Sequence, residues 1–319
     1  MKVEENMNGM SILVTGGAGF IGSHMVDRLV TEGACVTVFD NFHSGKKENL
    51  SQSINEIRLI KGDIRNRNFV ANVVRECNPA IVFHLAASAS VPDSVLHPEY
   101  NFETNVVGTF NLLHAMIKKP PRKFVFASSA AVYGSSNQIL KEGNSLIPVS
   151  PYGTSKQCGE ALCLSFERTF RIPLAIGRIF NVYGPRLSRY VMFDFYCKLK
   201  KNPKELQVLG DGKQTRQFCY ISDAVDALTL IANKGSSAYN IAGAERVSIS
   251  ELAGMMVSRM APKAKISYTG KSWPGDIKNL VADISKLKGI GFEPKTSLIK
   301  GIDHLIKWLD ENPPTIGSN

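Results

Sequence analysis

The sequence predicts an α/β fold class: a doubly wound parallel sheet followed by a smaller, mixed α/β lobe. Over the first 182 residues, short apolar runs alternate with segments whose apolar residues recur at helical spacing. A glycine cluster separates the first apolar run from the first helical segment, as in a strand–turn–helix unit. Strands that alternate with helices form parallel sheets with helices on both faces.

The N-terminal part contains six expected strands and four expected helices. The strands are short apolar runs, as buried parallel strands require. They are expected at residues 11–15, 34–39, 57–61, 81–85, 124–127 and 174–180, and the helices at 22–32, 69–77, 102–118 and 151–170.

The regular alternation stops after residue 182, where Pro, Gly, Lys and Asn become frequent. We therefore expect a nucleotide-binding domain over residues 1–182 and a substrate-binding lobe made mainly of residues 183–319. Residues 217–243 are expected to return to the first domain. Further helices are expected at residues 223–232, 251–260 and 299–309, and a short strand in "AYNIAG".

The composition excludes several classes of protein. No run of eighteen apolar residues occurs among the 319, and the first ten lack an apolar signal core, so we expect a cytoplasmic protein without a membrane span. The net charge of +10 is dispersed rather than striped, which favours an anionic small molecule over nucleic acid. The six cysteines and six histidines show no zinc spacing, so no metal is expected.

The glycine cluster predicts a dinucleotide site. Gly16, Gly19 and Gly22 stand between a strand and a helix, and Asp40 closes the next strand. Glycines admit a pyrophosphate, the helix N-terminus offers N–H donors, and an acid at position 40 binds ribose hydroxyls and disfavours a 2′-phosphate. NAD is therefore preferred over NADP, although Lys46 and Lys47 would tolerate a phosphate. The sequence "GDI" at 62–64 places a second acid, Asp63, within reach of the adenine.

Tyr152 and Lys156 lie four residues apart in an expected helix and therefore share a face. Such a pair also occurs by chance on helix surfaces. A free tyrosine has a pKa of about 10, which a nearby ammonium and the positive nicotinamide ring would lower. Tyr152 is thus a candidate proton acceptor during hydride transfer.

Motifs along nearly the whole chain carry a resemblance to a known family. They include "TGGAGFIGSH", "FHLAA", "NVVGTFNLL", "SSAAVYG", "SPYGTSK", "RIFNVYGPR", "GDGKQTRQFCYISD" and "PGDIKNLVADISK". The chain resembles the extended short-chain dehydrogenases/reductases, the NAD-dependent sugar-nucleotide epimerases and dehydratases. The resemblance implies a Rossmann domain and a bound NAD that is reduced and reoxidised in each turnover. It also implies a nucleoside diphosphate sugar substrate and a homodimer formed by two helices of each nucleotide domain.

The resemblance also implies roles for individual residues. Tyr152 would be the base, Lys156 would hold the nicotinamide ribose, and Ser129 would hydrogen-bond the reacting hydroxyl. The implied cofactor contacts, beside Tyr152 and Lys156, are Gly16, Gly19, Phe20, Ile21, Asp40, Asn41, Asp63, Ile64, Leu85, Ala86, Ala87 and Asn105. The implied substrate contacts, beside Ser129 and Tyr152, are Asn181, Val208, Arg216 and Asp276.

Ala130 and Ala131 bear on which reaction follows oxidation at C4. Dehydratases of this family carry Asp and Glu at these two positions, and its decarboxylases have a Glu in the same segment. Methyl groups transfer no protons, so the pattern favours 4-epimerisation of a UDP-hexose. A dehydratase that recruits Asp93, Glu142 or Asp194 stays open, as do a decarboxylase and a non-catalytic NAD sensor.

The chain departs from the family pattern at three places. Trp273 stands where many members have an Arg that reaches the phosphates, and Gln217 stands where Asp is usual. Ala89 and Ser90 replace a Lys found in some glucose/galactose epimerases. Arg186 or Arg189, in the expected variable substrate loop, would supply the charge that Trp273 lacks.

Overall fold

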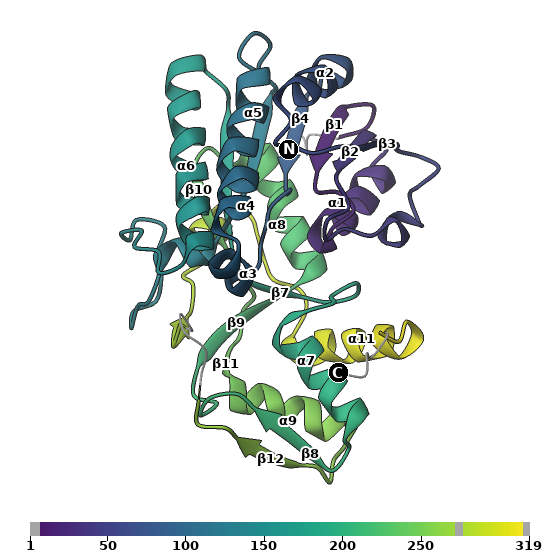
Figure 1. The fold of residues 1–319 in the computed structure, drawn as a ribbon, viewed down its shortest axis with the longest axis vertical. Helices are drawn as coiled ribbons and strands as arrows, with labels where there is room; N and C mark the ends of the chain where they lie inside the picture. The colour runs from purple at the N-terminus through teal and green to yellow at the C-terminus, as the bar shows by residue number, and fades with distance from the viewer. Residues whose placement is uncertain (1–6, 272–276, 315–319) are drawn as a thin grey trace.

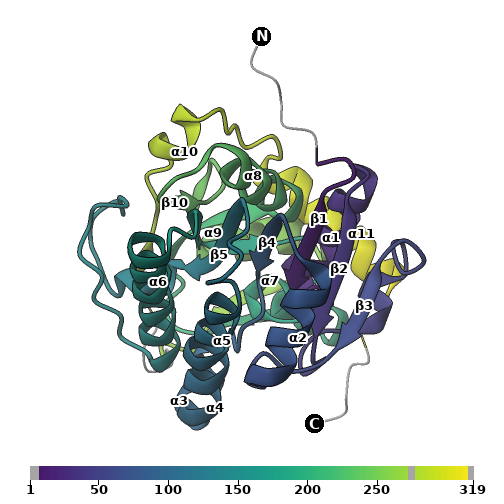
Figure 2. The same ribbon diagram turned by 90° about the horizontal axis from the view of Figure 1, so that it is seen from above.

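The computed structural model describes residues 7–271 and 277–314. Its centre is a seven-stranded sheet in the order β10-β6-β5-β4-β1-β2-β3, in which every pairing is parallel (Figures 1 and 2). The strands are β1 (Ser11–Thr15), β2 (Cys35–Asp40), β3 (Arg58–Lys61), β4 (Ile81–His84), β5 (Lys123–Ser129), β6 (Leu174–Ile179) and β10 (Ala238–Ile241). The predicted doubly wound α/β class is confirmed.

Helices cover both faces of this sheet. One face carries α1 (Phe20–Thr31) and α8 (Ile221–Lys234), and the other carries α2 (Arg67–Cys77), α5 (Gly108–Ala115) and α6 (Pro151–Phe170). Successive strand residues divide between the two cores, because side chains alternate across a strand. In β1, for example, Val14 packs on the α1/α8 side and Leu13 on the other.

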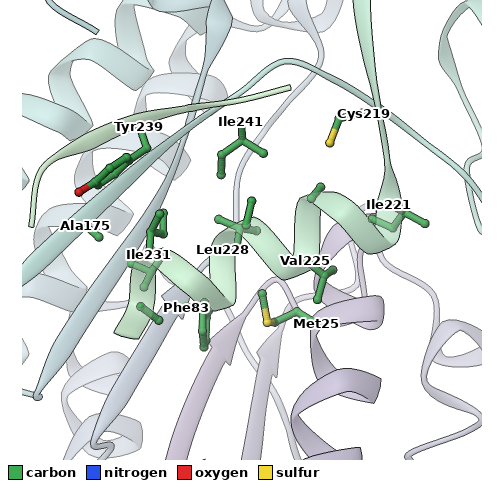
Figure 3. Close-up of a cluster of buried hydrophobic side chains, with 14 of the residues drawn as sticks. Met25, Phe83, Ala175, Cys219, Ile221, Val225, Leu228, Ile231, Tyr239 and Ile241 are labelled. Atoms are coloured by element: carbon green, nitrogen blue, oxygen red, sulfur yellow. The ribbon is translucent and has the colours of Figure 1, made fainter. Parts of the chain in front are cut away.

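Helix α8 forms much of the first core (Figure 3). Its residues Val225, Leu228 and Ile231 are fully or almost fully buried against the sheet, and Met25 of α1 lies beside them. After α8 the chain enters β10, which pairs with β6 at the edge of the sheet. Residues 221–241 therefore belong to the large sheet and its helical layer, although they follow the start of the second lobe in sequence.

The prediction of one continuous helix over residues 102–118 is wrong. The structure has α4 (Pro98–Phe102), a π-helical turn (Glu103–Val107) and then α5. The side chain of Asn105 in the turn bonds the main chain of Ser88 in both directions, and Thr109 Oγ1 donates to the carbonyl of Asn105. These contacts widen one turn, and such π-turns occur frequently at functional sites.

The second lobe is mixed α/β, as predicted, but the sequence analysis did not predict most of its strands and helices. One sheet contains β7 (Asn181–Tyr183), β9 (Thr215–Tyr220), β11 (Arg246–Ser248) and β13 (Asn279–Leu280), and β8 (Glu205–Val208) pairs with β12 (Lys265–Tyr268). Its helices are α7 (Tyr190–Lys201), α9 (Ile249–Met260) and α11 (Leu298–Glu311). The remaining short helices of the described chain, most of them in its N-terminal part, are α3 (Val91–Leu96), α10 (Ser285–Gly289) and the 3₁₀ turns at Lys47–Leu50 and Ala130–Tyr133. No helix in the described ranges has the length and apolar character to cross a membrane.

We expect Leu228→Ala to lower the free energy of unfolding by about 2–5 kcal/mol, because it leaves a cavity in the core beneath α8. Urea denaturation measures the change. Val95→Ala, at a side chain that is 61% exposed, is the control and should change stability by less than about 0.5 kcal/mol. Equal effects of the two substitutions would contradict this account of the core.

Candidate active site

A cavity of 660 Å³ lies at the carboxyl ends of the parallel strands, where the second lobe faces the sheet. In open parallel sheets ligands bind at this edge. Sixteen of the nineteen residues expected to contact the cofactor or the substrate line it: Gly16, Gly19, Phe20, Ile21, Asp40, Asn41, Ile64, Leu85, Ala86, Ala87, Ser129, Tyr152, Lys156, Asn181, Val208 and Arg216. Asp63 and Asn105 do not line it, and Asp276 and Trp273 fall outside the described residues.

The glycine loop forms a tight cradle between β1 and α1. Gly16 has a φ of 72°, and a Cβ there would lie 2.6 Å from the amide nitrogen of Ala86. A Cβ on Gly22 would lie 2.1 Å from the carbonyl oxygen of Gly16. The N-cap residue Gly19 offers no side chain, so the first N–H groups of α1 remain available to an anion. This cradle fits the pyrophosphate of a dinucleotide.

Asp40 ends β2 beside the glycine loop and is 7% exposed. Its carboxylate accepts hydrogen bonds from the N–H groups of Ala18 (2.9 Å) and Phe42 (2.7 Å), one on each oxygen. Burial raises the pKa of this carboxyl group, and the two N–H donors act in the opposite direction. Each oxygen keeps a lone pair, which is the geometry that two ribose hydroxyls need.

Two residues expected to contact the cofactor, Asp63 and Asn105, also bond other parts of the protein. Asp63 pairs with Arg65 at 3.0 Å and accepts a hydrogen bond from Asn41. The pKa of Asp63 falls to about 2 because these hydrogen bonds outweigh its partial burial. Asn105 is buried and bonds Ser88 and Ser155, so it joins the loop after β4 to α6 from behind the cavity wall.

The N-terminus of α6 places Tyr152 in the cavity. Ser150 caps the helix by accepting from the N–H of Gly153, and Ser94 Oγ of α3 accepts from the N–H of Tyr152. Burial raises the pKa of Tyr152 to about 12, and its hydrogen bond with Ser129 opposes this rise. The groups of the chain therefore keep the phenol protonated, whereas the sequence analysis expected a lowered pKa.

Lys156 lies one turn further along the same face of α6. Its ammonium donates to the carbonyl oxygen of Ala127 at 2.8 Å and lies 5.0 Å from the ring centroid of Phe126. Burial lowers the pKa of Lys156 to about 8, and the negative charge of Glu160 acts against this shift. Within the chain, the hydrogen bond with Ser129 and the charge of Arg189 lower the pKa of Tyr152, and a positive nicotinamide ring would lower it further.

A buried ion pair supports these residues from below. Arg178 of β6 donates to both carboxylate oxygens of Glu160, with a shortest contact of 2.8 Å, and Ser128 Oγ donates to the same carboxylate at 2.5 Å. Arg178 also bonds the hydroxyl of Tyr133, which donates to Asn240 at 2.7 Å. This network joins α6, β5, β6 and β10 next to Ser129, Tyr152 and Lys156.

His84 has a structural role. Its two ring nitrogens bond the hydroxyls of Thr15 and Thr109, and burial lowers its pKa to about 3, so the ring is neutral. Within the described ranges no group of three His, Cys, Asp or Glu side chains could hold a metal ion.

The second lobe supplies the other wall of the cavity. Arg216 of β9 donates to the carbonyl oxygens of Thr215 and Lys278, and Asn181 lies nearby on the adjacent strand β7. Gln217 is buried, donates to the carbonyl oxygen of Gly243 and accepts from the N–H of Ala282. The glutamine that replaces the usual Asp at this position therefore links three segments of the chain.

Of the two arginines expected in the substrate loop, one faces the cavity. Arg186 pairs with Asp27 of α1 at 2.7 Å and does not line the cavity. Arg189 does line it, as does Tyr190, which the sequence analysis did not single out. The loop adopts positive φ at Arg186 and Tyr190, and nothing in the residue types signals this.

Comparisons with known proteins agree with this geometry. A family model described as the NAD dependent epimerase/dehydratase family matches residues 12–242. A putative UDP-glucose 4-epimerase of Methanocaldococcus jannaschii is 35% identical over 95% of this chain and 100% of its own length. UDP-glucuronic acid decarboxylase 4 of Arabidopsis thaliana is 34% identical over 93% of this chain and 68% of its own length. The crystal structure of a Bacillus cereus UDP-glucuronic acid 4-epimerase, in complex with UDP-glucuronic acid and NAD, matches with a TM-score of 0.87 and 31% identity, covering 94% of this chain and 99% of that one.

The parallel sheet, the glycine cradle and Asp40 define a dinucleotide-dependent Rossmann enzyme. The chain belongs to the NAD-dependent epimerase/dehydratase family, and its cofactor is NAD. The expected extended short-chain dehydrogenase/reductase relationship is confirmed.

We expect NAD to bind more weakly as the pH rises above about 8, because Lys156 then loses the proton that a ribose hydroxyl would accept from it. The dissociation constant, measured by calorimetry, should rise by up to about tenfold per pH unit. Lys156→Met should bind NAD weakly with no such dependence, while Lys118→Met, at an exposed lysine, should behave as the parent protein. A parent profile that stays flat to pH 10 would show that Lys156 does not hold the cofactor.

Proposed function

We propose that this enzyme catalyses 4-epimerisation of a nucleoside diphosphate sugar of the UDP-hexose type. The observation that carries the proposal is the segment Ser129-Ala130-Ala131, which lines the cavity together with Tyr152 and offers a hydroxyl followed by two methyl groups. An epimerase needs a proton acceptor at C4 and no second acid or base. The relatives that are epimerases support the same reaction.

In this mechanism Ser129 and Tyr152 receive the C4 hydroxyl, and Tyr152 removes its proton. A bound NAD would supply the acceptor and later the donor of the C4 hydride, which would return to the opposite face of the 4-keto sugar. Tyr152 then gives the proton back to the C4 oxygen, so the enzyme ends the cycle unchanged. Lys156 holds the nicotinamide ribose, and Asp40 holds the adenosine ribose. Asn181 and Arg216 bind the diphosphate, and Val208 lies over the nucleoside.

Dehydration and decarboxylation are the competing reactions, and decarboxylases do occur among the relatives. The carboxylates that line the described part of the cavity are Asp40, at the adenosine end, and Asp194, which pairs with Lys198 at 2.7 Å. Glu142 bonds the N–H of Asn240, and neither Glu142 nor Asp93 lines the cavity. This distribution of acids favours epimerisation over both alternatives.

The reaction can be identified by NMR of the protein incubated with UDP-glucose, UDP-galactose and their N-acetyl and uronate forms. Inversion at C4 supports the proposal. A 4-keto-6-deoxy product would identify a dehydratase instead, and a pentose product with release of CO₂ would identify a decarboxylase.

We expect Tyr152→Phe to reduce turnover by about 10²- to 10⁴-fold while the protein keeps its NAD, because the substitution removes only the proton acceptor. Turnover is measured by NMR and NAD content by absorbance after denaturation. Tyr268→Phe, at a tyrosine outside the cavity, should leave both unchanged. Full biological activity of Tyr152→Phe would indicate a non-catalytic NAD sensor.

We also propose that the enzyme is a cytoplasmic homodimer. Helices α5 and α6 lie side by side (Figures 1 and 2). The segment from α4 to α6 exposes Phe102, Val107, Leu164 and Phe170 to solvent. A second copy that packs there would cover these side chains. Six free thiols are consistent with a reducing compartment.

We expect Leu164→Glu to shift the protein from dimer to monomer, because a carboxylate would have to be buried at the interface. Light scattering coupled to gel filtration measures the mass. Ile299→Glu, at an exposed residue of α11, is the control and should leave the dimer intact. A parent protein that elutes as a monomer would exclude the dimer.

A further inference from the structure

An aromatic contact joins two distant segments of the chain at the adenosine end of the cavity. His43 belongs to the loop that follows β2, and its ring centroid lies 4.8 Å from that of Tyr100 in α4, with the ring planes tilted by 39°. Aromatic rings at this separation attract each other. Both side chains line the cavity, and the mechanism above uses neither of them.

The strand order places this contact across the glycine cradle. The cradle follows β1, and β1 lies between β2 and β4 in the sheet. The loop with His43 follows β2, whereas α4 with Tyr100 comes after β4, so the two segments start from opposite flanks of the cradle. Asp40, whose carboxylate suits a ribose, ends β2 shortly before His43. A dinucleotide that extends from Asp40 into the cradle therefore passes the point where the two rings meet.

The backbone of the loop is fixed on the glycine loop. The N–H of Lys46 and the side-chain amide of Asn49 both donate to the carbonyl oxygen of Ala18, at 3.0 and 2.9 Å. Gly45 packs so closely on Ala18 that a Cβ at Gly45 would lie 2.9 Å from it. Phe42 has a φ of 58°, a strained value for a bulky residue, which surrounding contacts have to maintain. The loop therefore stays in place, and the exposed side chain of His43 is the part that can rotate away.

Tyr100 is fixed from its own side of the cavity. The guanidinium carbon of Arg65 lies 4.7 Å from the centroid of the Tyr100 ring, within the range of a cation–π contact. Arg65 pairs with Asp63 at 3.0 Å, and Asp63 accepts a hydrogen bond from the amide of Asn41. The side-chain oxygen of Asn41 accepts from the N–H of His43 at 2.9 Å. These five residues thus form a closed circuit of contacts in which the pair of rings is the only link without a hydrogen bond or a charge.

We infer that His43 and Tyr100 form a clasp across the bound dinucleotide, and that this clasp has to open each time NAD enters or leaves. The clasp makes NAD exchange slow without contributing to its affinity, because a contact that closes the path resists entry as much as exit. A reaction that regenerates NAD in each cycle tolerates slow exchange. The inference concerns only the exchange of NAD, so it holds whichever reaction the enzyme catalyses.

The clasp is tested by two measurements, the release of radiolabelled NAD from the loaded enzyme and the dissociation constant of NAD from calorimetry. His43→Ala and Tyr100→Ala should each speed release by about 2- to 12-fold, the factor expected for loss of one aromatic contact. The dissociation constants should stay within about 1.5-fold of the parent value, since association becomes faster as well. Tyr100→Phe keeps the ring and should behave as the parent protein. His97→Ala, at an exposed histidine beside α4 that does not line the cavity, is the control.

The double variant His43→Ala/Tyr100→Ala should release NAD no faster than the quicker single variant, because either substitution already opens the clasp. Unchanged release from both single variants would overturn the inference. Equal increases in the release rate and the dissociation constant would also overturn it and make the two rings ordinary contacts of NAD. Absence of C4 inversion in the NMR assay would instead refute the proposed function, because NAD exchange is measured without turnover.

Discussion

The buried pair of Glu160 and Arg178 is the interaction on which the arrangement of this site depends. Glu160 follows Lys156 by one helical turn, and Ser128, which also bonds the pair, precedes Ser129 in β5. Burying two charges is unfavourable unless their hydrogen bonds are satisfied, and removing one partner of such a pair destabilises a protein by about 3–5 kcal/mol. Here Ser128, Tyr133 and the carbonyl of Glu142 complete the bonding. The pair thus sets how α6 sits on the sheet, and with it the separation of Ser129, Tyr152 and Lys156.

Burial shifts the protonation of Tyr152 and Lys156 in opposite directions. It disfavours both the phenolate of Tyr152 and the ammonium of Lys156, so two pKa values that are ordinarily similar move apart, to about 12 and about 8. A phenol with so high a pKa is a poor base near neutral pH. In the proposed mechanism, a positive nicotinamide ring would lower the pKa of Tyr152 beyond the effect of Ser129 and Arg189, and proton removal would then depend on oxidised NAD.

Much of the fold and part of the site could be predicted because their signals are local. The glycines, Asp40 and the Tyr152/Lys156 pair act through spacing along one strand or one helix. Nothing in the sequence shows that Asp63 also pairs with Arg65, or that Asn105 also bonds the main chain of Ser88, because these partners are not set by spacing within one strand or helix. Helix α7 has apolar residues at helical spacing, including Met192, Phe195 and Leu199. It begins at Tyr190, whose positive φ no residue pattern predicts. Tyr190 itself is tied to a distant loop, because its hydroxyl donates to the carbonyl oxygen of Ala89.

The way in which the chain passes between the two lobes limits how the enzyme can open. It leaves the large sheet after β6 to form β7, returns from β9 into α8, and leaves again between β10 and β11. After β13 it returns once more, with Ile284 and Leu287 in the core of the large sheet, and then leaves for α11. Neither lobe is one continuous piece of chain, so the two cannot be separated by a single cut. A rigid hinge rotation would have to bend five connections together. Ligand entry therefore falls to the loops at the rim, and unfolding of one lobe would pull strands and helices from the other.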